Sequence, residues 1–149
     1  MQKKYILSVS LFFYAACLPT YAIRGVANGD PVLGIECLIG GPFGIFAGLI
    51  GVADGELAAL MNVSYWLANP IYALAFYFTV LGKTRVASMT ALISVGIMLS
   101  FLIAQRAPTG RDFTIEAVSI DIGYILWVTA GVILLIGNIK VIRPPHPAR

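Results

Sequence analysis

Charge is scarce in this chain. Only 11% of its 149 residues are Asp, Glu, Lys or Arg, whereas 59% are hydrophobic, and the mean hydropathy is +0.89. A soluble domain of this length could not bury so much apolar surface. The chain also lacks a long polar tract in which a nucleic-acid-binding module could reside. The composition therefore predicts a membrane protein whose main partner is the lipid bilayer and which does not bind nucleic acid.

Groups that carry chemistry are equally scarce. The chain has one histidine, His146, which lies in the Pro-rich segment RPPHPAR, and two cysteines. Hydrolysis or metal chemistry needs paired carboxylates, a nucleophile with a base, or a His/Cys/Asp cluster at ligand spacing. The apolar runs contain no such set, and their Ser and Thr hydroxyls are expected to bond back to their own helices. We therefore predict no enzymatic activity, no cofactor and no metal.

Continuous apolar runs take the place of polar sequence. An α-helix needs roughly 20 apolar residues to cross a bilayer, with a range of about 17 to 25, and four runs meet this length: about 5–22, 63–81, 86–104 and 122–139. The alternation expected of strands is absent, which predicts an all-α class in one membrane domain, followed by a flexible tail over 143–149. The first run also has the form of a secretory signal, and we favour a retained helix over cleavage.

A fifth apolar run, over residues 32–55, is rich in glycine and contains Pro42 and Glu36. At 100° per residue five of its glycines fall within about 80° of one another, which predicts a smooth face for close helix packing. Insertion of this segment is marginal, so we predict a re-entrant or interfacial helix on the outer side. The alternative is a fifth transmembrane helix. The five glycines are Gly40, Gly44, Gly48, Gly51 and Gly55.

The positions of the charges favour four crossings over five. Lys and Arg collect on the cytoplasmic side of membrane helices. With four crossings and a cytoplasmic N-terminus, seven basic residues lie inside and three outside, and all seven carboxylates lie outside. This predicts a multi-pass protein of the bacterial inner membrane with both termini in the cytoplasm. The seven basic residues are Lys3, Lys4, Lys83, Arg85, Lys140, Arg143 and Arg149.

Three further features are candidate sites. Asn69 and Pro70 fall inside an apolar run, where the proline predicts a kink and the asparagine predicts a bond to a neighbouring helix or to the loosened backbone; a ligand-binding or gating break is the alternative. Cys17 and Cys37 are interpreted as buried thiols, with a disulfide between them as the alternative. Five aromatic residues have positions typical of interfacial belts: Tyr21, Tyr65, Trp66, Tyr124 and Trp127.

The segments WLANP at 66–70, GYILW at 123–127 and GIECL at 34–38 resemble a recurring type of small bacterial four-span membrane protein with no assigned function. The resemblance implies the four-helix architecture and no activity. The function expected from the sequence is therefore structural or accessory, through helix packing with itself or with a larger membrane complex. The alternative is a small transporter or channel formed by oligomers.

Overall fold

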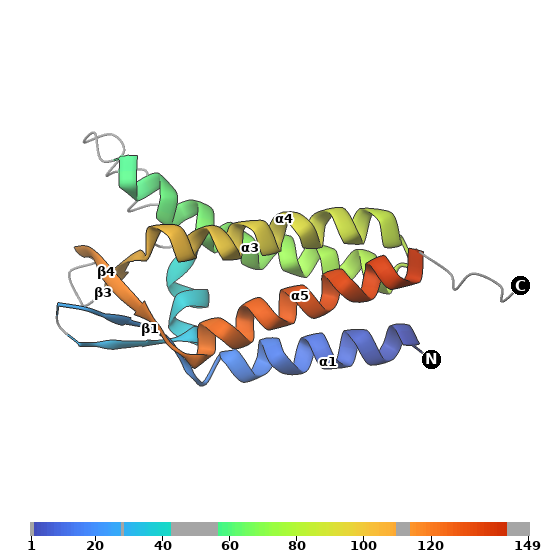
Figure 1. Cartoon of the computed structure of the whole chain (residues 1–149), viewed down its shortest axis with the longest axis horizontal. Coiled ribbons are helices and arrows are strands. Elements are labelled where there is room, and N and C mark those ends of the chain that lie inside the picture. Colours follow the sequence, from blue (N-terminus) through green and yellow to red (C-terminus); the bar gives the residue numbers. More distant parts are fainter. Residues whose placement is uncertain (1, 28, 43–56, 110–113, 143–149) are drawn as a thin grey trace, which may run out of the picture.

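Four long helices lie side by side, with a small β-sheet at one end (Figure 1). The computed structural model describes residues 2–27, 29–42, 57–109 and 114–142. The helices are continuous apolar segments, as their hydropathy predicts. They are α1 (Gln2–Cys17), α3 (Leu57–Val80), α4 (Thr84–Ala104) and α5 (Ile122–Ile142).

The sheet contradicts the all-α class. It has four strands in the order β2-β1-β4-β3, and each neighbouring pair is antiparallel. The central pairing joins the two connections, because Ile23 of β1 lies opposite Ile120 of β4. The two connections satisfy their backbone groups by pairing with each other. The strands are β1 (Tyr21–Gly25), β2 (Pro31–Leu33), β3 (Arg106–Thr109) and β4 (Thr114–Ile120).

The prediction of four transmembrane helices is also not supported, nor is its five-helix alternative. Among the described residues, two stretches are long and apolar enough to cross a membrane, Thr84–Ile103 in α4 and Ile122–Lys140 in α5. The apolar part of α1, Lys4–Cys17, is shorter; at 1.5 Å per residue the 16 residues of α1 extend about 24 Å, less than the bilayer core of about 30 Å. The molecule is thus not a plain integral membrane helical bundle.

The glycine-rich segment begins as a strand and continues as a helix. Val32 and Leu33 belong to β2, and residues 34–42 are helical. The remainder of the predicted packing face, Gly44, Gly48, Gly51 and Gly55, lies outside the described residues. Gly40 lies within them, and a Cβ added there would meet nothing within 4 Å.

Two glycines of α5 leave room for side chains of the neighbouring helices. A Cβ added to Gly137 of α5 would overlap the side chain of Ile6 of α1, and one added to Gly131 would lie 3.0 Å from the side chains of Met98 and Val95 of α4. Small residues permit such close packing between helices. The α5 helix therefore packs against α1 and α4, while α4 packs in turn against α3.

A hydrophobic cluster at the base of the sheet fixes it on the helices. Ile23 and Val118 of the sheet pack with Phe101 of α4 and Tyr124 of α5, and all four are at most 6% exposed. Gly123 permits this arrangement, because a Cβ there would lie 2.7 Å from the carbonyl oxygen of Tyr21. The first turn of α5 consequently abuts β1.

The start of α1 and the end of α5 lie at the same end of the molecule (Figure 1). Helices α4 and α5 form an antiparallel pair with β3 and β4 at its tip, while α1 begins and α5 ends at the opposite end of the molecule (Figure 1). The turn between α3 and α4 lies at this same end, with Gly82 at φ 76°. At the sheet end α4 is closed by Gln105 at φ 43°, whose N–H donates to the carbonyl oxygen of Phe101.

Candidate functional site

Asn69 of α3 connects three helices. Its Oδ1 accepts a hydrogen bond of 2.9 Å from Trp127 Nε1 of α5 and one of 3.1 Å from the hydroxyl of Tyr14 of α1. Pro70 follows it directly within α3, and the ring removes one backbone donor at this point. Trp127 is therefore bonded within the molecule, although its sequence position was interpreted as part of an interfacial belt.

A second set of hydrogen bonds centres on Ser10 of α1. Ser10, which is fully buried, donates to the carbonyl oxygen of Ala130 at 2.8 Å, so the hydroxyl of Tyr72 donates to Ser10 Oγ at 2.7 Å. The rings of Tyr14 and Tyr72 are stacked, with centroids 4.7 Å apart and planes 4° apart. We call Ser10, Tyr14, Asn69, Tyr72 and Trp127 the central polar cluster.

A groove lies beside this cluster, between α1 and α3. It has a volume of about 220 Å³ and is lined by Leu11, Tyr14, Tyr72, Ala73 and Phe76. The two tyrosine hydroxyls in its wall are already hydrogen-bonded to Asn69 and Ser10. An occupant of the groove would therefore meet hydrocarbon and aromatic carbon, which favours an apolar one.

Asn69→Leu is expected to lower the free energy of unfolding by about 1–3 kcal/mol, because the donors on Tyr14 and Trp127 would be left without their acceptor. Thermal unfolding of the purified protein in detergent measures the change. The matched control is Ser100→Ala, which removes an exposed bond to the carbonyl oxygen of Ile97 within α4. Equal stability of the two variants would show that the central polar cluster does not hold the helices together.

A second polar contact joins α3 and α5 near the C-terminal ends of both helices. Nδ2 of Asn138, which is 1% exposed, donates to Thr79 Oγ1 and to the carbonyl oxygen of Leu134, both at 2.8 Å. Thr79 passes its own proton to the carbonyl oxygen of Ala75. The Oδ1 of Asn138 is buried without a hydrogen-bond partner. Asn138 was not predicted as a site residue, although an asparagine in an apolar run is the same signal that identified Asn69.

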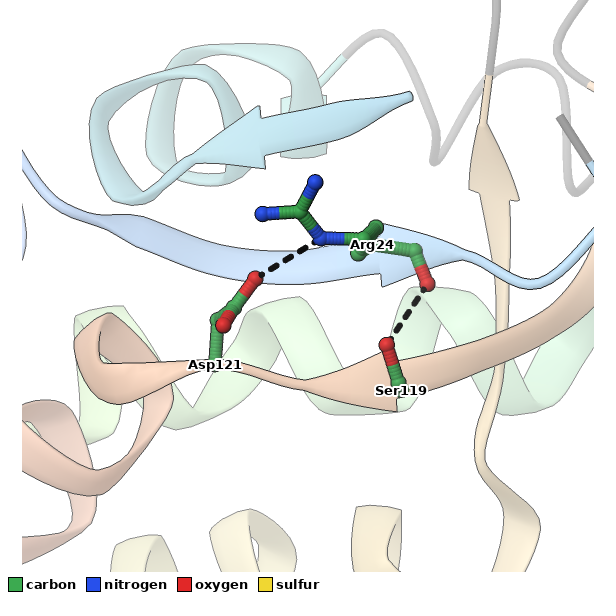
Figure 2. A network of polar contacts seen from close by, with 3 residues as sticks. All are labelled: Arg24, Ser119 and Asp121. Atoms are coloured by element: carbon green, nitrogen blue, oxygen red, sulfur yellow. Dashed lines mark hydrogen bonds and ion pairs between the residues drawn. The ribbon is translucent and has the colours of Figure 1, made fainter. Parts of the chain in front are cut away.

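The sheet carries a small ionic contact on its surface (Figure 2). Arg24 Nε of β1 lies 3.4 Å from Asp121 Oδ2, and the two side chains are 45% and 33% exposed. Ser119 of β4 donates to the carbonyl oxygen of Arg24 at 3.3 Å. Exposed ion pairs of this kind contribute about 0–1 kcal/mol. The contact therefore adds little to the stability that the shared hydrophobic cluster provides.

The other aromatic residues assigned to belts are mostly turned inward. Trp66 donates to the carbonyl oxygen of Leu38 at 2.9 Å, and Tyr124 donates to that of Met98. The ring of Tyr65 packs edge-on against Phe101. Tyr21 differs from the rest, because it is 47% exposed, with the guanidinium of Arg24 5.9 Å above its ring.

Cys17 and Cys37 are both free thiols in the structure. Cys17 is buried at the end of α1, and Cys37 is half-buried in the helical segment 34–42. Burial is the main reason that the pKa of Cys37 is raised to about 12, and the nearby carboxylate of Glu36 adds to the shift. The thiolate, which is the reactive form, is therefore disfavoured at Cys37.

Alkylation of Cys37 is expected to stay slow up to about pH 10 in the folded protein and to become fast after denaturation. Because folding raises the pKa of Cys37, the contribution of this thiol to the free energy of unfolding is complete below about pH 9. It is lost as the pH rises toward 12, where the unfolded chain gives up the thiol proton and the folded protein keeps it. Iodoacetamide labelling followed by peptide mass spectrometry measures the rate at each pH. If the alkylation rate of the folded protein showed the pH dependence of an ordinary exposed thiol, that result would contradict the burial of Cys37.

Comparisons with known proteins identify no relative: no family model, no curated protein and no solved structure matches the chain. Within the described ranges, no three His, Cys, Asp or Glu side chains gather in a way that could hold a metal ion.

Proposed function

We propose that the protein is a small membrane protein anchored by the antiparallel pair α4 and α5, and that it has an accessory role through contacts with other membrane components. The observation that carries this proposal is the apolar outer surface of these helices. Met89 and Ile103 of α4 are 67% and 90% exposed, whereas the polar side chains of Ser94 and Asn138 are buried, at 0% and 1% exposure. The exposed face of a water-soluble helix is polar.

The interior bonding fits a lipid environment. Ser94 of α4 donates to the carbonyl oxygen of Ala68 of α3 at 2.9 Å, so its hydroxyl is satisfied across a helix interface. Such bonds between helices, together with small residues such as Gly131, are the contacts that hold helices together where lipid removes the hydrophobic driving force. Meanwhile α5 exposes Ile125 and Ile136 on its outer surface, at 53% and 46%.

The separation of charges fits an oriented insertion. All described carboxylates lie in or beside the sheet, namely those of Asp30, Glu36, Glu116 and Asp121. The described basic residues at the opposite end are Lys3, Lys4, Lys83, Arg85 and Lys140. The rule that basic flanks stay in the cytoplasm then supports a cytoplasmic position for both ends of the chain and an external position for the sheet.

Membrane anchoring is tested first by extraction at alkaline pH, where the protein is expected to remain with the membrane pellet. Orientation is tested with a membrane-impermeant maleimide on Ser119→Cys in β4 and Arg85→Cys at the start of α4, with the parent protein as background. In intact cells with a permeable outer envelope, Ser119→Cys is expected to react, and Arg85→Cys only after lysis. Release by alkali, or the reverse labelling pattern, would contradict the proposal.

An accessory role is supported over transport by the bonding of Asn69. Its Oδ1 is occupied by two donors from neighbouring helices, which makes it a packing contact. Photocrosslinking separates the two roles: a benzophenone side chain at the exposed position of Met89 is expected to give protein adducts, and one at buried Ser94 is the control. Solute or ion flux in reconstituted vesicles, without adducts from Met89, would contradict the accessory role.

A further inference from the structure

The groove between α1 and α3 is aligned with two lysines at one end of the molecule. Leu11, which lines the groove and is 50% exposed, follows Lys4 by seven residues. Seven residues are close to two helical turns, so both lie on one face of α1, about 10 Å apart along its axis. On the other wall, Phe76 lies one turn before the end of α3 at Val80, and Lys83 follows in the turn that leads to α4.

The two lysines are available to an anion. Lys4 and Lys83 are both exposed, and they lie at the end of the molecule where α1 begins and α3 turns into α4 (Figure 1). All seven carboxylates of the sequence lie within two segments, residues 30–56 and residues 112–121. Both segments are outside α1, α3, α4 and α5. The field at this end is therefore positive, and it complements a phosphate.

The lining of the groove restricts its occupant. The five residues of its walls are aliphatic or aromatic. The hydroxyls of Tyr14 and Tyr72 are already bonded and present no free donor. Such walls favour a flexible hydrocarbon chain.

We propose that an anionic phospholipid binds along α1 and α3, with an acyl chain in the groove and its headgroup phosphate against Lys4 and Lys83. The two features are independent: the groove selects an apolar chain and the lysines select a negative charge. This proposal rests on the proposed membrane location for its source of ligand. The binding itself is measured in detergent solution, so its failure is distinguishable from a failure of membrane anchoring.

The test titrates purified full-length protein in detergent with acyl-labelled fluorescent phosphatidylglycerol and, separately, with the matching phosphatidylcholine. Phosphatidylglycerol is expected to bind at least tenfold more tightly. Lys4→Gln and Lys83→Gln should each weaken its binding about fivefold and should weaken the binding of phosphatidylcholine less, because the choline cation already neutralises that phosphate. Arg106→Gln, an exposed cation on β3 at the other end, is the matched control and should change neither lipid.

The groove is tested by filling it. Ala73→Trp is expected to lower the affinity for both lipids tenfold or more, because the indole would occupy the space of the acyl chain. Ile125→Trp is the control: Ile125 lines a larger groove of about 360 Å³ at the sheet end, between α4 and α5. Each variant must retain its helical circular dichroism, and Ala73→Met provides a smaller, graded obstruction should the tryptophan prevent folding.

Three results would overturn the proposal. Equal affinity for the two lipids would show that the lysines do not select an anionic headgroup. Unchanged binding in both Ala73 variants would show that the acyl chain does not lie in the groove. Complete displacement of phosphatidylglycerol by inorganic phosphate would show that an anion alone is bound. Alkaline extraction of the same protein reports separately on membrane anchoring.

Discussion

Replacing Gly41 by alanine is expected to detach the helical segment 34–42 from α3. The added methyl group would overlap the indole ring of Trp66. This ring donates from Nε1 to the carbonyl oxygen of Leu38 at 2.9 Å, so it cannot turn aside without losing that bond. We expect overpacking and the lost bond together to cost about 3 kcal/mol or more. The alkylation rate of Cys37, which lies in the same segment, should rise at least tenfold.

Gly40 provides a neighbouring control, because a Cβ added there would meet nothing within 4 Å. Gly40→Ala should leave the labelling of Cys37 unchanged and raise helix propensity slightly. A double-mutant cycle with Trp66→Ala isolates the contact: in the absence of the indole ring, Gly41→Ala should have little further effect. If Gly40→Ala and Gly41→Ala changed the stability and the labelling rate of Cys37 equally, that result would contradict the contact between Gly41 and Trp66.

The second large effect is expected at Gly137, where α1 and α5 touch. A methyl group there would overlap Cγ2 of Ile6 and lie 2.9 Å from its Cδ1. Cγ2 is attached directly to the Cβ of a β-branched residue, so it has little freedom to move. Gly137→Leu, with a larger side chain, should separate the two helices and cost about 3 kcal/mol or more in thermal unfolding.

Two companion variants make this result specific. Ile6→Ala removes the three atoms that an alanine at Gly137 would meet, so the pair Ile6→Ala with Gly137→Ala should be more stable than the two separate losses predict. Gly96→Ala of α4 is the control, since a Cβ there meets nothing within 4 Å. A loss of stability at Gly96 as large as that at Gly137 would contradict the role of helix proximity.

The long helices were predictable from hydropathy, because an apolar run needs no knowledge of its partners to be identified. The sheet was not predicted, since its central pairing joins β1 to a strand about ninety residues later: Arg24 and Ser119 are 95 positions apart. A local signal existed for the other pair. β3 and β4 are separated by a short segment that contains Gly110, and this spacing is typical of a hairpin.

The central polar cluster could be predicted only in part. Asn69 was recognisable as a costly residue in an apolar run, but its partners Tyr14 and Trp127 come from distant helices. The hydroxyls show the same limit. Thr129 bonds to its own helix as expected, whereas Ser10 and Ser94 bond across to other helices. The choice depends on how closely a neighbouring backbone approaches, and periodicity carries no such information.

The predicted glycine face stays a prediction, because four of its five glycines lie outside the described residues. Within them, Gly40 has open space, and Gly41, which the prediction left out, is in contact with Trp66. The glycines between the long helices, Gly131 and Gly137, are spaced six apart in α5 and so form no small-xxx-small pair. They differ from Gly96 only in what lies opposite them.

The pairing of β1 with β4 has a consequence for biogenesis. Strand β1 leaves the ribosome together with the first fifth of the chain, whereas β4 appears only in the last third. During this interval one edge of β1 carries unsatisfied amide and carbonyl groups, and only the short strand β2 can shield its other edge. The sheet can therefore close only after β4 has been synthesised, about ninety residues after β1.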